Sequence, residues 1–155
     1  MRATFTIVLA AALLAGCATQ HQPLAGACAL VAELYERQDR DDSPFFQTDS
    51  REKVDAFFEP VLADFIWREA VDANGEIGAL DFVPMWNAQD FDVTDFVIHP
   101  PVRDGSGARV DVTFTNSGKP ERITYRLVRV RGEWRIANIE YLDGTNLRAI
   151  LAAVY

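Results

Sequence analysis

The first half of the chain repeats its apolar residues at the three- and four-residue spacing of an amphipathic helix. The first stripe consists of Ala27, Leu30, Val31 and Leu34. This stripe predicts a helix over residues 26–38. Residues 49–52, Asp-Ser-Arg-Glu, resemble a capping box and introduce a second stripe that runs to about residue 70. Because proline removes a backbone donor and clashes with the preceding turn, Pro60 predicts a kink or a restart inside that stripe.

The second half changes to the two-residue alternation of β-strands. The predicted strands are residues 91–99, 109–115, 123–127 and 134–141. Tight turns join the later strands into an antiparallel meander, and the alternation slips by one near Ala137 and Asn138, which predicts a β-bulge. Residues 147–154 predict a short closing helix. Helices followed by an antiparallel meander predict the α+β class, with a curved sheet because a bulge bends the strand that contains it.

The amino-terminal segment has the composition of a secretory signal. Arg2 precedes a short apolar stretch at residues 7–14, which is far below the about 20 apolar residues that cross a bilayer. Residues 14–17, Leu-Ala-Gly-Cys, resemble a bacterial lipobox. The resemblance implies cleavage before Cys17 and lipid chains on its sulfur and amino terminus. The alternative is an ordinary secretory peptide in which this cysteine is incidental.

Lipidation predicts where the protein is located. Two or more acyl chains anchor a protein stably to a membrane without crossing it. Lipoproteins with aspartate after the lipidated cysteine tend to stay at the inner membrane, so Ala18 implies the outer membrane, periplasmic side. The predicted organisation is a signal peptide at residues 1–16, a lipidated tether at 17–25 and a single domain at 26–155.

Composition and charge restrict the classes of ligand that the protein is expected to bind. The chain has 15 basic and 23 acidic residues, and loss of Arg2 with the signal peptide leaves a net charge of −9. Nucleic acid is therefore excluded, because its phosphates require a basic face. The sequence contains no CxxC motif and no cluster of histidines and cysteines around His21 or His99, so no metal or other cofactor is predicted. Once Cys17 is acylated, Cys28 is the only thiol left, and we expect it to be a small buried hydrophobe.

Three segments resemble a bacterial branch of the nuclear-transport-factor-2-like superfamily, whose domains form α+β cones. They are residues 80–94, 114–120 and 132–139, and the resemblance spans roughly residues 28–155. The branch is known as a domain of unknown function. Cones of this class host isomerases, dehydratases, binding proteins and subunit partners, so the resemblance implies the fold and says little about activity.

In such cones, the connection at residues 84–90 approaches the mouth of the pocket. Trp86 offers a stacking face, Asn87 and Gln89 offer amides, and Asp90 offers a carboxylate, which together could bind a small molecule. The alternative makes Trp86 a plug of the core, and makes Gln89 and Asp90 caps of the local backbone.

An enzyme of the isomerase or hydrolase type would need an acid or base in an apolar pocket. Asp81, Asp90 and Tyr125 are the catalytic candidates, and nothing in their spacing singles out a pair. The sequence also departs from superfamily enzymes that combine a histidine with an aspartate, because no histidine falls on a clear pocket-facing strand position.

Arginines on the predicted strands form a candidate partner face. Its members are Arg109, Arg122, Arg126 and Arg135. They could simply be exposed residues paired with Asp111 and Glu133, or they could dock an acidic partner or a second copy of the chain. We expect a membrane-anchored periplasmic binding or interaction module, with an envelope protein, a homodimer or a small molecule as its ligand. The alternatives are a small-molecule enzyme that uses a carboxylate in the cone pocket, and an immunity protein against an envelope toxin.

Overall fold

The computed structural model describes residues 22–155, so the predicted signal peptide, Cys17 and the start of the predicted tether lie outside the described residues. The helices are α2 (Gln22–Asp39), the 3-10 turn η1 (Pro44–Phe46), α3 (Arg51–Asp55), α4 (Pro60–Ala73) and α5 (Leu147–Ala152). The strands are β1 (Val93–Ile98), β2 (Val102–Asp104), β3 (Gly107–Asn116), β4 (Lys119–Val130) and β5 (Glu133–Tyr141). None of the helices in this part of the chain combines the length and apolar character that crossing a bilayer requires.

The first helix starts earlier than predicted. α2 begins at Gln22 rather than near Gly26, so the second half of the predicted tether is helical. Pro23 does not prevent this, because a proline in the first turn of a helix lacks an N–H that would have no partner there.

The second predicted helix is two helices, and Pro60 is where the second one starts. Glu59 caps α4 by accepting hydrogen bonds from the backbone N–H groups of Val61 and Leu62. The capping box predicted at residues 49–52 was wrong. Ser50, rather than Asp49, is the residue directly before α3; its side chain accepts no capping hydrogen bond, and its hydroxyl donates to the Glu52 carboxylate.

The sheet is antiparallel, with the order β1-β3-β4-β5 and with β2 paired to β3. The predicted bulge is confirmed: Arg126 lies opposite Asn138 and Leu127 lies opposite Ile136, so Ala137 is the extra residue. A second irregularity lies in β1, and the sequence did not predict it. Beyond β5, residues 57–59 extend the sheet through backbone hydrogen bonds to Ile136.

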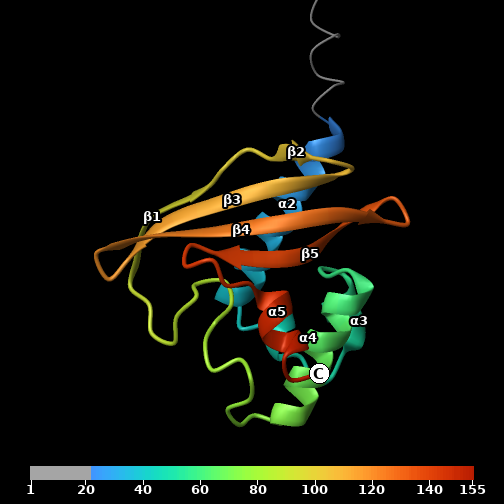
Figure 1. Cartoon of the computed structure of the whole chain (residues 1–155), viewed down its shortest axis with the longest axis vertical. Helices are drawn as coiled ribbons and strands as arrows, with labels where there is room; N and C mark the ends of the chain where they lie inside the picture. The colour runs from blue at the N-terminus through green and yellow to red at the C-terminus, as the bar shows by residue number, and fades with distance from the viewer. Residues whose placement is uncertain (1–21) are drawn as a thin grey trace, which may run out of the picture.

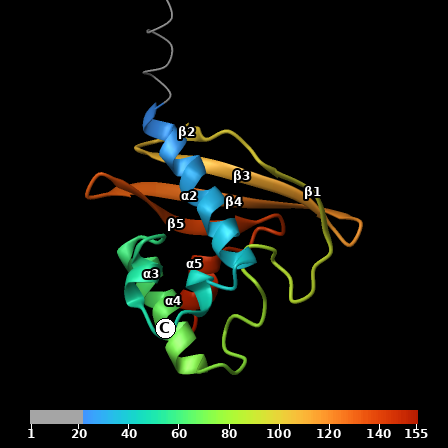
Figure 2. The same cartoon turned by 180° about the vertical axis from the view of Figure 1, so that it is seen from behind.

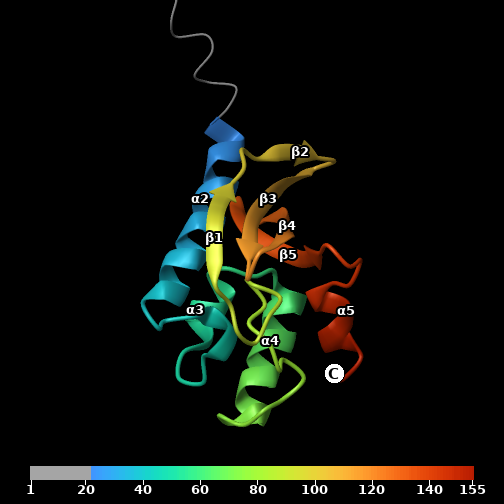
Figure 3. The same cartoon turned by 90° about the vertical axis from the view of Figure 1, so that its left-hand side faces the viewer.

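The helices cover the two faces of the sheet unequally. α2 crosses one face (Figure 2), whereas Figure 1 looks onto a face that no helix of residues 22–155 covers. We call this second side the open face; it carries the side chains of β3 and β4 that alternate with the buried ones. α4 and α5 pack together beside β5 (Figure 3). Helices packed on a curved antiparallel sheet confirm the predicted α+β class.

Candidate functional site

Trp86 belongs to the core. Its ring is 8% exposed and makes edge or tilted contacts with the rings listed here in chain order: Tyr35, Phe91, Phe96 and Phe114. These rings come from α2, from β1 and the residues before it, and from β3, so Trp86 joins the helical layer to the sheet. This arrangement is the core plug that the sequence left open as the alternative to a ligand-binding role.

Tyr125 lies under the same cluster. Its hydroxyl donates to the hydroxyl of Tyr35 at 3.0 Å, and Tyr35 donates in turn to the carbonyl of Met85 at 3.1 Å. Burial away from water raises the pKa of both phenols, so both stay neutral. A buried, neutral phenol with a satisfied hydroxyl is poorly placed for acid–base chemistry on a ligand.

The other candidates of the 81–90 segment lie at the surface. The amide of Gln89 lies 3.5 Å from the carboxylate of Asp81, and both side chains are exposed, as is Asp90. Asn87 has a left-handed backbone, at φ 50°, in a turn closed by the hydrogen bond from Val83 N–H to the Ala88 carbonyl. The structure therefore brings Asp81 and Gln89 together but separates Asp81 and Asp90 from the buried Tyr125.

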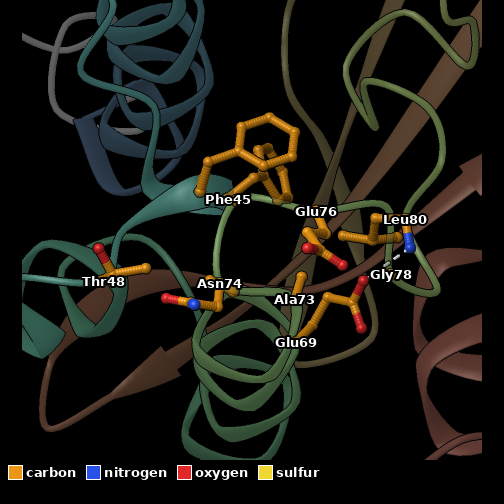
Figure 4. A pocket seen from close by; sticks show the side chains of 11 residues that line it. Phe45, Thr48, Glu69, Ala73, Asn74, Glu76, Gly78 and Leu80 are labelled. Carbon is orange, nitrogen blue, oxygen red and sulfur yellow. Dashed lines mark hydrogen bonds between the residues drawn. The ribbon is translucent and has the colours of Figure 1, made fainter.

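Two adjoining hollows lie where α4 ends, and we call them together the groove. One has a volume of about 400 Å³ and lies between η1, the last turns of α4 and residues 75–80 (Figure 4). The other has a volume of about 450 Å³ and lies between residues 75–83 and Gln89. Both are lined by Phe46, Gly75, Glu76 and Leu80. No local sequence pattern predicts the groove, because it forms only where η1 and α4 meet the loop that follows α4.

Glu69 fixes the inner wall of the groove. Its carboxylate is 4% exposed and accepts hydrogen bonds from Leu80 N–H at 2.8 Å (Figure 4) and from the Tyr155 hydroxyl at 2.9 Å. Burial, followed by this hydrogen bond, raises the pKa of Tyr155 to about 12. Gly78 is needed here, because a Cβ atom at this position would lie 2.2 Å from the carboxylate oxygen of Glu69. The loop therefore packs tightly on α4.

The predicted partner face is largely neutralised by its own acids. Arg126 pairs with Glu140 at 3.0 Å and with Asp104, and Arg109 lies 3.5 Å from Asp111. Arg135 is tied to the end of α3, because its Nε donates to the Asp55 carbonyl, and it also pairs with Glu133. Of the four arginines, Arg122 alone forms no ion pair within residues 22–155. At three of the four positions, these contacts support the alternative in which the arginines are exposed residues paired with acids of the same chain.

His99 and Cys28, the other side chains with reactive chemistry, contact neighbouring residues of the fold. The Nε2 atom of His99 lies 2.7 Å from the Thr113 hydroxyl, and the half-buried Cys28 thiol lies 4.0 Å from the His99 carbonyl. Within residues 22–155, no three His, Cys, Asp or Glu side chains come together as metal ligands.

Comparison with known proteins leaves the family open. No protein-family model matches the chain, and no curated protein matches it. A chain in the crystal structure of the type VI native effector–immunity complex Tae3–Tai3 from Ralstonia pickettii is similar in structure. Its sequence is 21% identical to that of this chain, and the TM-score is 0.45. The match covers 75% of this chain and 93% of that chain. A similarity this distant does not identify a function.

Proposed function

We propose that the protein is an interaction module of the bacterial envelope, which binds a protein partner on its surface. The observation that carries this proposal is the filled interior. Trp86, Tyr35 and Tyr125 occupy the space between α2 and the sheet in which a cone-type enzyme would hold its substrate.

The enzyme alternative requires a carboxyl group in an enclosed apolar pocket, and the candidate carboxylates do not meet this requirement. An isomerase-type site places a carboxyl group in an apolar pocket, where burial tunes its protonation. Asp81 and Asp90 are both exposed, and the buried carboxylate of Glu69 already accepts two hydrogen bonds. None of the three is therefore a substrate-facing acid or base in an enclosed apolar site.

The same proposal places the protein on the outer membrane, periplasmic side, through a lipid anchor at Cys17. The lipobox-like residues 14–17 support this placement. The order of helices and meander strands supports membership in the nuclear-transport-factor-2-like superfamily. Metabolic labelling with a palmitate analogue tests the anchor: label is expected on the wild type and on the matched control Cys28→Ser, and is lost in Cys17→Ser. Label retained by Cys17→Ser would refute the anchor.

Immunocapture of the full-length lipidated protein from envelope extracts tests the function. We expect a protein partner at a fixed stoichiometry, which then rebinds when both components are purified. Inhibition of that partner's activity would identify the special case of an immunity protein. A bound small molecule without any protein partner would refute the proposal.

A further inference from the structure

The groove has the properties of a docking site, and the charges around it indicate what docks there. We infer that the protein binds its partner through this groove and that the partner presents a basic, partly apolar segment. The inference rests on the proposed function, because it names the surface and the partner chemistry of the same interaction.

The residues around the groove carry a one-sided charge. No lysine or arginine occurs between Arg68 and Arg103. The acids of this interval are Glu69, Asp72, Glu76, Asp81, Asp90, Asp92 and Asp95. None of the seven forms an ion pair within residues 22–155, whereas the acids Asp104, Asp111 and Glu140 near the open face pair with arginines. Three of the seven, Glu69, Glu76 and Asp81, line the groove, so the described lining carries acids and no basic residue.

The groove also exposes apolar surface that a monomer would normally bury. Ile77 is 86% exposed on the loop between α4 and β1, and Phe46 of η1, which lines the same hollow, is 49% exposed. Leu80, Phe82 and Val83 complete the apolar lining. An apolar centre surrounded by charged residues is the usual anatomy of a protein interface.

A lysine or arginine side chain fits this combination of surfaces. Its apolar stem can lie on Phe46 and Ile77 while its charged end approaches Glu76. The carboxyl end of α4 opens into the same hollow at Ala73 and Asn74, and the helix dipole adds partial negative charge there. Among residues 22–155, no lysine or arginine lines either hollow.

Two other occupants fit less well. A second copy of this chain has the same large negative charge, which opposes association of two acidic grooves. A lipid surface is disfavoured because the end of α4 lies at the opposite end of the molecule from the start of α2 in Figures 1, 2 and 3. The proposed anchor at Cys17 precedes α2 in the chain, and the anionic lipids of a membrane would repel the acidic groove.

Peptide binding tests the inference. The lipidated protein in zwitterionic nanodiscs is titrated with a fluorescent lysine–alanine peptide, with a glutamate–alanine peptide of equal length and empty nanodiscs as controls. We expect the basic peptide alone to bind. Binding should weaken at least about tenfold in Glu76→Lys and also in Ile77→Ser, since few interface residues carry most of the affinity.

A matched variant separates a specific site from general attraction. Glu121→Lys makes the same charge change on β4, outside the groove, and its affinity should stay within about twofold of the wild type because salt screens distant charges. Hydrogen exchange should slow at residues 74–82 when the peptide binds. Equal weakening by Glu76→Lys and Glu121→Lys, or protection confined to β3 and β4, would overturn the inference.

The captured partner distinguishes failure of this inference from failure of the proposed function. Loss of the partner in Glu76→Lys, with retention in Arg122→Glu on the open face, supports the groove. Retention in Glu76→Lys with loss in Arg122→Glu overturns the groove while the interaction function stands. Absence of any protein partner in the capture refutes the proposed function itself.

Discussion

Replacement of Trp86 by alanine tests whether the interior is packed rather than hollow. The substitution removes the largest ring of the aromatic cluster, which lies between α2, β1 and β3 and is 8% exposed. A pocket-lining tryptophan could be truncated at little cost, because solvent or ligand space already adjoins it. A core plug would leave a cavity that its close-packed neighbours cannot fill.

The expected loss is large for a domain of this size. Truncation of a buried tryptophan to alanine costs about 3–5 kcal/mol in free energy of unfolding. Total stabilities are typically about 5–15 kcal/mol, so the variant should be marginally stable or unfolded. Trp86→Phe is the matched control. It keeps one aromatic ring, leaves a smaller cavity and removes an indole N–H that has no hydrogen-bond partner in the described part of the chain, so it should cost clearly less than the alanine substitution.

Urea denaturation followed by circular dichroism measures both variants. We expect the alanine variant to shift the midpoint far below that of the wild type, and the phenylalanine variant to shift it clearly less. A loss below about 1 kcal/mol in Trp86→Ala would mean that the ring is not a structural plug. The filled interior, and with it the argument against an internal active site, would then be wrong.

Three further predictions concern the buried hydrogen bonds and the loop beside the groove. Tyr35→Phe should destabilise the protein more than Tyr125→Phe, which should cost about 1 kcal/mol in urea denaturation, because the Tyr35 hydroxyl serves two partners. Burial raises the pKa of all four tyrosines, so the free energy of unfolding should fall as the pH rises above 10. Tyrosinate absorbance should therefore appear only when the protein unfolds. Tyrosine titration near pH 10 in the intact fold would contradict this prediction. Gly78→Ala should displace the Glu69 carboxylate and leave Leu80 N–H without its acceptor, at a cost of about 1–3 kcal/mol; unchanged thermal stability would contradict the close approach.

Local periodicity was sufficient to predict most of the elements. The apolar stripe of α2 and the alternation in β3, β4 and β5 are each visible within one element, because each buries one face. The restart at Pro60 and the bulge at Ala137 were also predictable, since each breaks a regular pattern locally. β2 was not predicted, because all three of its residues are exposed and no alternation marks it.

The candidate site depended on contacts that the sequence does not display. The role of Trp86 is decided by rings from distant elements, so the local composition of residues 84–90 was compatible with both a pocket and a plug. The groove forms where Phe46 of η1 meets the end of α4 and the following loop. One signal for it was available: the acidic interval between Arg68 and Arg103 contains no lysine or arginine.

Hydrogen exchange of the lipidated protein, alone and in complex with its captured partner, tests the central claim most directly. The account predicts slower exchange at surface residues 74–82 and unchanged exchange around Trp86 and Tyr125, because the partner binds outside a packed interior. Slower exchange confined to the core, together with a small molecule that is released by Trp86→Phe, would contradict it.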